Sequence, residues 1–449
     1  MESAETFGRP NTVQRGKLLR VLGVGFGLAM AVGSAIGVGI LRNPSGVAEQ
    51  LHSSWLIMFA WMLGGVYCVL GINYLAELAT MTPKAGGFYV YAHRAFGNYG
   101  GFVVGWSDWA NQTLAMAYIS VAFGEYASGL LTPDWPWGRV LWGVALLIML
   151  TAVNWMGVRS GSGMQKFTSL LKGVALIAFV IACFVVGGGP TDNAAPVPAP
   201  VTSTGVFAAL TAFVLAFQII IGTYDGYYGP IYFSEEDTNP SRNIVQSMFG
   251  GIAIITLIYV AVNAGLLYVL PIPSLAASKF AAGDAIAVMF GSGAGQIVTV
   301  LALLSLIGVA NATLMLTPRI LLAIGRDGLF TPKATEVNKG GTPTFALLIT
   351  TICALILTVA GTFELLLAIA QFLFVVINIM LVVALFRLRR TEPDAERPFR
   401  AWGYPLAPLL MLIFAVLLFV GYCVSNPFPS AIAAGGLALS YPLFRLVKR

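Results

Sequence analysis

Twelve long apolar runs limit what this chain can fold into more than any other feature of its sequence. Each run has about 20 mostly apolar residues, the length that an α-helix needs to cross the hydrocarbon core of a bilayer. Such runs predict an all-α polytopic membrane protein with 12 transmembrane helices. The predicted helices cover residues 21–49, 54–79, 101–131, 138–157, 164–187, 205–234, 245–270, 285–317, 343–361, 364–386, 403–424 and 427–444.

The composition argues against most soluble classes of protein. Of the 449 residues, 58% are hydrophobic and 10% are charged, whereas an ordinary soluble protein has about 25% charged residues. Too few charges remain to cover a water-exposed surface, so a cytosolic enzyme, a secreted disulfide scaffold and a disordered chain are all disfavoured. The runs also lack the alternating pattern, in segments of about ten residues, that a membrane β-barrel needs.

The basic residues give the predicted orientation. With the N-terminus in the cytoplasm, every Lys and Arg falls in a cytoplasmic segment except Arg42, Arg139, Lys172 and Lys279. Both termini are then cytoplasmic, in a multi-pass protein of the cell membrane, either inner or plasma membrane. The first 20 residues contain no small-residue cleavage site, so we expect the first apolar run to be retained.

Two of the apolar runs contain helix-breaking residues. The first holds GSAIGVGI (33–40) followed by Asn43-Pro44, and the sixth holds GTYDGYYGP (222–230). In a helix, Gly costs about 1 and Pro about 3 kcal/mol relative to Ala. Backbone freed in this way is tolerated in a membrane where it lines a cavity. Gly-rich surfaces for close helix packing are the alternative interpretation.

The breaks fall at matching places in two successive blocks of five helices, a pattern typical of inverted-repeat transporters that bind substrate at the midplane. The N-terminus of a half-helix presents free N–H groups that suit a carboxylate, and a half-helix C-terminus presents carbonyls that suit an ammonium. Two facing breaks therefore suit a zwitterion. The predicted parts are a cytoplasmic tail, a first five-helix repeat, an extracellular linker, a second five-helix repeat, a cytoplasmic loop, and two final helices with a short tail: 1–20, 21–187, 188–204, 205–386, 387–402 and 403–449.

Four ordered motifs resemble those of the amino acid–polyamine–organocation (APC) superfamily, whose members share the LeuT-type fold. The motifs are GSAIGVGIL (33–41), YLAELATMTPKAGGFYVYAHRAFG (74–97), TYDGYYGPIYFSEEDTNPSRNI (223–244) and NATLMLTPRILLAIGRDGLF (311–330). The resemblance covers nearly the whole chain. It implies a 5+5 inverted repeat followed by two C-terminal helices, and a transporter of amino acids.

The resemblance also implies where a substrate binds. Its carboxylate is expected at the N–H groups of Gly37, Val38 and Gly39, and its amino group at carbonyls near Ala35 and at Gly222 and Asp225. The predicted substrate-binding residues are Ala35, Ile36, Gly37, Val38, Gly39, Gly222, Thr223, Tyr224, Asp225 and Gly226.

The chain departs from the family pattern at three of these positions. Gly222 stands where many members have a gating Phe, Tyr227 replaces the usual Trp, and Val38 offers no hydroxyl. Because of these departures the sequence predicts neither which residue forms the gate nor the size of the substrate; a roomier pocket is one interpretation.

Ionisable residues within the runs are candidate functional groups, because burying them in a membrane is costly. Lys172 is the predicted coupling residue: an ammonium beside the first break removes the need for sodium, and a buried amine can release a proton. In the family, a Lys in this context lies where sodium-coupled relatives bind sodium. The alternative is that Lys172 snorkels to the inner interface.

The acidic residues leave more alternatives open. Asp225 either meets a substrate amine, takes a proton, or caps the second half-helix. Asp108 either pairs with a basic group near an inner gate or has a structural role, and Glu125 lies near the opposite end of the same run. Three further carboxylates are either gating groups or ordinary interfacial ones: Glu77, Glu235 and Glu236. Arg42, just above the first break, either lines the outer vestibule or snorkels outward.

No cofactor, metal or nucleic acid is predicted. The two histidines and four cysteines have no metal-ligand spacing, and no phosphate-binding GxxxxGK[ST] motif is present. No cysteine falls in an outer loop, so we expect no disulfide-linked partner. The expected partners are an amino acid substrate, protons and the lipid bilayer.

The sequence thus predicts a secondary active transporter that moves amino acids by alternating access, through proton-coupled symport or exchange, without sodium. An amine or polyamine antiporter and a transporter-like nutrient sensor are the alternatives. A channel would need repeated carbonyl or charge rings, and a membrane enzyme would need clustered catalytic groups; neither pattern is seen, and we predict no enzymatic activity.

Overall fold

A computed structural model describes residues 17–188 and 205–447 of the chain. Within these residues the secondary structure is helical, and β pairing is limited to two isolated bridges. The elements are α1 Val24–Ala35, α2 Gly39–Gln50, α3 Ser54–Met81, α4 Phe88–Leu131, α5 Gly138–Trp155, α6 Val158–Val186, α7 Val206–Tyr224, the 3₁₀ helix η1 Gly229–Glu236, α8 Pro240–Val269, α9 Ile272–Ala277, α10 Ala281–Phe290, η2 Ser292–Ala294, α11 Gly295–Arg326, η3 Pro332–Thr335, α12 Thr344–Ala360, α13 Phe363–Thr391, α14 Leu406–Ser425 and α15 Pro427–Val447.

The all-α membrane fold is confirmed. Within the two described ranges, ten helical segments are long and apolar enough to cross a bilayer, one of them comprising α7 and η1 together, and the bent pair α1 and α2 makes an eleventh. The run predicted at 343–361 forms α12, which has only 17 residues. The count of 12 spans therefore stays a prediction, as does the division into two repeats.

One predicted boundary is wrong for a local reason. The run at 285–317 is split, because α10 ends at Phe290 and Gly291 adopts φ +86° before α11 begins at Gly295. The run predicted at 101–131 forms the longer part of α4, which begins at Phe88 but is kinked at Gly97, where φ is +73° and the backbone is not helical. The predicted tail at 1–20 and linker at 188–204 lie mostly outside the described residues.

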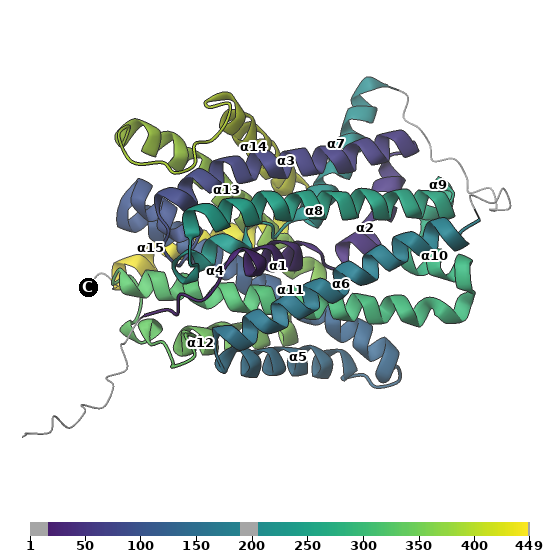
Figure 1. Cartoon of the computed structure of the whole chain (residues 1–449), viewed down its shortest axis with the longest axis horizontal. Coiled ribbons are helices and arrows are strands. Elements are labelled where there is room, and N and C mark those ends of the chain that lie inside the picture. The colour runs from purple at the N-terminus through teal and green to yellow at the C-terminus, as the bar shows by residue number, and fades with distance from the viewer. Residues whose placement is uncertain (1–16, 189–204, 448–449) are drawn as a thin grey trace, which may run out of the picture.

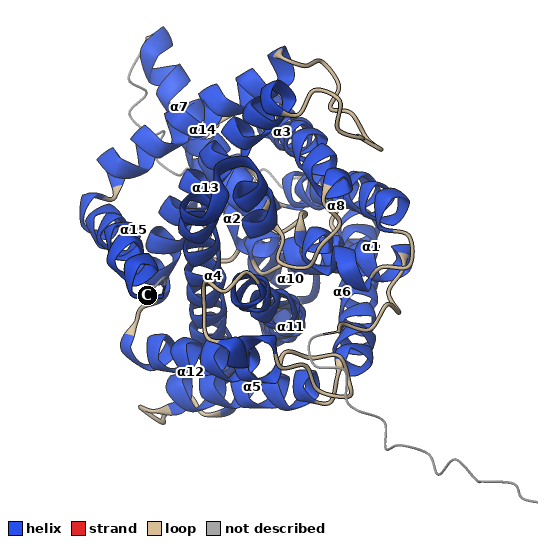
Figure 2. Ribbon diagram, turned by 90° about the vertical axis from the view of Figure 1, so that its left-hand side faces the viewer, coloured by secondary structure: helices blue, strands red, loops and turns tan. Residues whose placement is uncertain are grey.

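The long helices lie side by side along the long axis of the molecule (Figure 1). Seen end-on, α4 and α11 run near the middle of the bundle, where α4 packs against α11 and α13 (Figure 2). The helices α14 and α15 lie at its rim. Their outer faces carry exposed apolar side chains such as Leu417 and Val424, as expected of a surface that contacts lipid.

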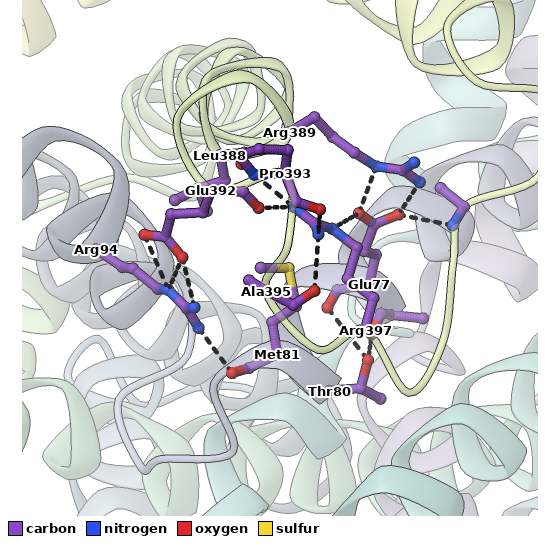
Figure 3. Close-up of polar contacts among 12 residues, drawn as sticks. Glu77, Thr80, Met81, Arg94, Leu388, Arg389, Glu392, Pro393, Ala395 and Arg397 are labelled. Carbon is purple, nitrogen blue, oxygen red and sulfur yellow. Dashed lines mark hydrogen bonds and ion pairs between the residues drawn. The ribbon is translucent and has the colours of Figure 1, made fainter.

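At one end of the bundle, a buried carboxylate ties the loop after α13 to the end of α3 (Figure 3). Glu77 is fully buried and accepts hydrogen bonds from Arg389 at 2.7 and 2.5 Å, from Arg397 at 3.1 Å and from the N–H of Ala401 at 2.7 Å. Arg397 in turn donates to backbone carbonyls at the end of α13 and in the loop. Glu77 therefore has a structural role at this interface.

We expect Glu77→Gln to destabilise the protein strongly, because it leaves two arginine side chains without their buried counter-charge. Breaking a buried ion pair on one side costs about 3–5 kcal/mol. The matched control is Glu392→Gln, since Glu392 pairs with Arg94 at 2.6 Å but both side chains are about a third exposed, and such pairs contribute about 0–1 kcal/mol. Thermal unfolding in detergent measures both; equal shifts in Tm would contradict the assignment.

Candidate functional site

The first break lies between α1 and α2. α1 ends at Ala35, Ile36 is extended with φ −76° and ψ 94°, and α2 begins at Gly39 with no side-chain cap. The two helix axes differ by 46°. Among the described residues, no acceptor is hydrogen-bonded to the N–H groups of Gly37, Val38 or Gly39. A half-helix N-terminus with free, half-buried N–H groups has the electrostatic character that an anion requires.

The second break follows α7. The helix ends at Tyr224, Asp225 takes φ −57° and ψ 147°, and Gly226 takes φ +105° before η1 begins at Gly229. The conformation of Gly226 is one that L side chains rarely adopt. A Cβ atom there would lie 2.8 Å from the backbone carbon of Ser34. The two breaks are therefore in direct backbone contact.

Polar side chains join the two breaks as well. The hydroxyl of Tyr259 lies 2.9 Å from the carbonyl oxygens of both Ala35 and Thr223, one in each break. Asn43 donates its amide N–H to the Thr223 hydroxyl at 2.7 Å. Thus α8, which carries Tyr259, holds both helix ends at one level of the bundle.

The residues of the second break differ in their accessibility. Gly222 is exposed although it lies in the last turn of α7, and a Cβ atom there would meet nothing within 4 Å. Asp225 accepts a hydrogen bond from the N–H of Gly226 at 2.9 Å. The capping alternative for Asp225 is wrong, because η1 starts without a side-chain cap. The open space beside Gly222 and the carboxylate of Asp225 thus lie within one turn of each other.

Lys172 of α6 points its ammonium at the end of α1. Its Nζ donates to the carbonyls of Gly33 at 2.6 Å and Ile36 at 2.7 Å, and the side chain is 2% exposed. A Cβ atom on Gly308 of α11 would lie 3.0 Å from Nζ, so the ammonium sits between α1 and α11. The snorkelling alternative is therefore wrong.

The sequence analysis missed the residues that accompany Lys172. Ser169 donates to the carbonyl of Ala29 at 2.8 Å, and Gln165 accepts from Asn311 at 2.8 Å. With Lys172 they form a polar row at spacing i, i+4 and i+7 along α6, which places them on one face of the helix. That spacing is the signal that could have identified the row, whereas Tyr259 carries no such local signal.

One end of the site is closed by buried contacts of η1. Asp108 of α4 is fully buried and accepts from the hydroxyl of Tyr232 at 3.0 and 2.8 Å. Glu236 pairs with Arg319 of α11, with one contact at 2.8 Å, and the guanidinium of Arg319 also lies over the ring of Phe233. Within the described part of the chain Asp108 makes no ion pair, so the expected basic partner is absent there.

The charges at the opposite end are exposed. Glu125 lies 3.9 Å from Arg139, with side chains 52% and 38% exposed. Arg42, in the first turn of α2, is exposed too, and Glu235 pairs with Arg326 at the closed end. Glu125 and Asp108 therefore lie near opposite ends of the part of α4 that follows the kink at Gly97, as predicted for the run at 101–131, and only Asp108 belongs to the buried contacts.

Two glycines four residues apart provide a test of this geometry. We expect Gly226→Ala to lower the Tm, because a strained left-handed residue costs about 1–3 kcal/mol and its methyl group would clash with Ser34. We expect Gly222→Ala to leave the Tm unchanged or raise it, since Ala is favoured over Gly in a helix by about 1 kcal/mol. Thermal unfolding of both variants measures this, and equal effects would contradict the contact between the breaks.

Comparison with known proteins identifies the family. A family model described as amino acid permease matches residues 27–444. The serine/threonine exchanger SteT of Bacillus subtilis is 28% identical over 88% of this chain and 89% of its own length. The b(0,+)-type amino acid transporter 1 of Mus musculus is 28% identical over 91% of this chain and 84% of its own length. The large neutral amino acids transporter small subunit 2 of Homo sapiens is 28% identical over 96% of this chain and 80% of its own length. The chain therefore belongs to the amino acid permease family of the APC superfamily.

Proposed function

We propose that this permease is a secondary transporter that binds one amino acid where its two broken spans meet and carries it by alternating access. The observation that carries the proposal is the backbone contact between Gly226 and Ser34. Because of this contact, the free N–H groups of the first break and the carbonyl groups at the ends of α1 and α7 lie close together. Binding at a midplane site between broken helices is the general arrangement in inverted-repeat transporters.

The substrate carboxylate binds the N–H groups of Gly37, Val38 and Gly39, and its ammonium binds carbonyls near Ala35 and Gly222 together with Asp225. The substrate side chain extends into the space beside Gly222. The remaining members of the proposed site line the same two breaks: Ile36, Thr223, Tyr224 and Gly226. Because SteT is described as a serine/threonine exchanger and the human relative as a transporter of large neutral amino acids, both small and large neutral amino acids belong in the first substrate panel.

Lys172 is the proposed coupling residue. Its ammonium fills the carbonyl end of α1, where a free cation would otherwise bind, so we propose that transport needs no sodium. Loss of the proton on Nζ would weaken both hydrogen bonds to α1 and free that helix to move relative to α6 and α11. This arrangement supports either proton symport or amino acid exchange.

Alternating access requires the closed end to open. The buried contacts of η1, Tyr232 with Asp108 and Glu236 with Arg319, must separate before substrate leaves on that side. We propose that this end faces the cytoplasm of a cell membrane and that both termini lie there. The positive-inside distribution of Lys and Arg supports that orientation.

An amine or polyamine antiporter is the second candidate. It is favoured by one observation: the Asp225 carboxylate lies at the second break and forms no ion pair with any described residue. Such a carboxylate would suit a ligand with additional positive charge.

Uptake by purified protein in proteoliposomes tests the proposal. The panel contains labelled serine, threonine, leucine, arginine and putrescine, each measured with and without sodium, a pH gradient or internal counter-substrate. We expect sodium-independent uptake of an amino acid, stimulated by either a pH gradient or internal amino acid. Uptake of putrescine alone would support the antiporter, and a strict sodium requirement would overturn the proposed role of Lys172.

We expect Lys172→Met to reduce uptake at least tenfold, because each hydrogen bond from a charged group contributes about 1.5–3 kcal/mol. Lys172→Arg keeps the charge but does not lose a proton, so this variant should fold and lose any pH dependence of transport. Lys166→Met is the control, since Lys166 is exposed on the same helix. If Lys172→Met retained full pH-dependent uptake, coupling through this residue would be disproved.

A further inference from the structure

A groove of about 410 Å³ lies away from the breaks, between the start of α4 and the last turns of α13. Its walls combine apolar and cationic side chains. The lining residues are Phe96, Val383, Phe386, Arg387, Arg390 and Thr391. Val383, Arg387 and Arg390 follow one another at spacings of four and three residues, so they lie on one face of α13.

The two arginines of the groove differ from the others nearby. Arg94, Arg389 and Arg397 are held by Glu392 or Glu77. In the two described ranges, no carboxylate lies within ion-pair distance of Arg387 or Arg390. Both are exposed, and Arg387 lies over the ring of Phe96 at 5.6 Å. The groove therefore has two positive charges without a protein counter-charge.

Along α13 the apolar residues of the groove come before its arginines, just as the acyl chains of a membrane leaflet lie deeper than the headgroups. α13 is a membrane-spanning helix whose apolar part gives way to charge at its C-terminal end. Arg387 lies about 6 Å beyond Val383 along the helix axis and Arg390 about 10 Å beyond it. Apolar walls at the depth of acyl chains, with cations one to two turns nearer to the surface, complement a phospholipid with an anionic headgroup.

We propose that this groove binds an anionic phospholipid. Its phosphate lies between Arg387 and Arg390, where guanidinium groups can donate paired hydrogen bonds, and an acyl chain packs against Phe96, Val383 and Phe386. An alternative explanation for the two arginines is that cations near the C-terminus of a helix interact favourably with its dipole. That interaction does not account for the groove or for the Phe96 ring beneath Arg387. The proposal does not depend on the transported substrate.

Lipid retention by the full-length protein tests the proposal. The protein is reconstituted in equal amounts of phosphatidylglycerol and phosphatidylcholine, re-extracted, washed in detergent and examined by native mass spectrometry. We expect wild-type protein to retain phosphatidylglycerol preferentially. Arg387→Gln/Arg390→Gln should lower that retention on the order of fivefold per arginine, which corresponds to about 1 kcal/mol each, and leave phosphatidylcholine unchanged.

The charge-matched control is Arg159→Gln/Arg242→Gln, which removes two exposed arginines from α6 and α8. It should retain phosphatidylglycerol like the wild type, and an equal loss would mean that general charge attraction, and not the groove, holds the lipid. Phe96→Ala keeps both arginines and should still weaken retention severalfold. Each variant is first required to elute as a single monodisperse species.

Free phosphate is the competing source of the same chemistry. If 10 mM inorganic phosphate displaced phosphatidylglycerol completely, or raised the Tm of lipid-free protein as much as the lipid does, the site would be an anion site and the lipid proposal would be overturned. Retention that survives phosphate but falls in Phe96→Ala supports a lipid bound by both its headgroup and its chain.

Discussion

A carbonyl at the end of a helix inside a bilayer needs a donor, because the hydrocarbon core holds no water to replace the missing helical partner. The first broken span creates such carbonyls at Gly33 and Ile36, and the ammonium of Lys172 donates to both. The carbonyls in turn compensate a buried charge that would otherwise be costly. The end of α1 and the Lys172 side chain therefore stabilise each other, and the geometry of the first break depends on that pairing.

The backbone groups freed at the breaks need hydrogen-bond partners, and the described part of the protein supplies these for the carbonyl groups but not for the N–H groups. On the acceptor side, the Tyr259 hydroxyl lies between the carbonyls of Ala35 and Thr223, and its single hydrogen is donated to one of them at a time. On the donor side, the N–H groups from Gly37 to Gly39 find no acceptor within the described residues. The protein thus leaves unfilled the half of the site that suits a carboxylate, which agrees with a substrate that always carries one.

The parts that could be predicted from the sequence have local causes. Glycine and proline break a helix wherever they cluster, so both breaks were predicted, and a lysine within an apolar run is conspicuous by its cost. Tyr259 could not be predicted, because a tyrosine in an apolar helix has the same local pattern whether it contacts a break or lipid. The end of α10 at Phe290 was missed because the glycines at 291 and 293 lie within a run that remains apolar on average.

The approach of Gly226 to Ser34 sets how the bent spans can move. The two backbones are in direct contact there, because Gly226 has no side chain and Ser34 has only a short one. Because the two backbones are in contact here, a displacement of one span at this point has to be accommodated by the other. Any movement that separates the two spans must therefore break this contact, which is a constraint that both spans share.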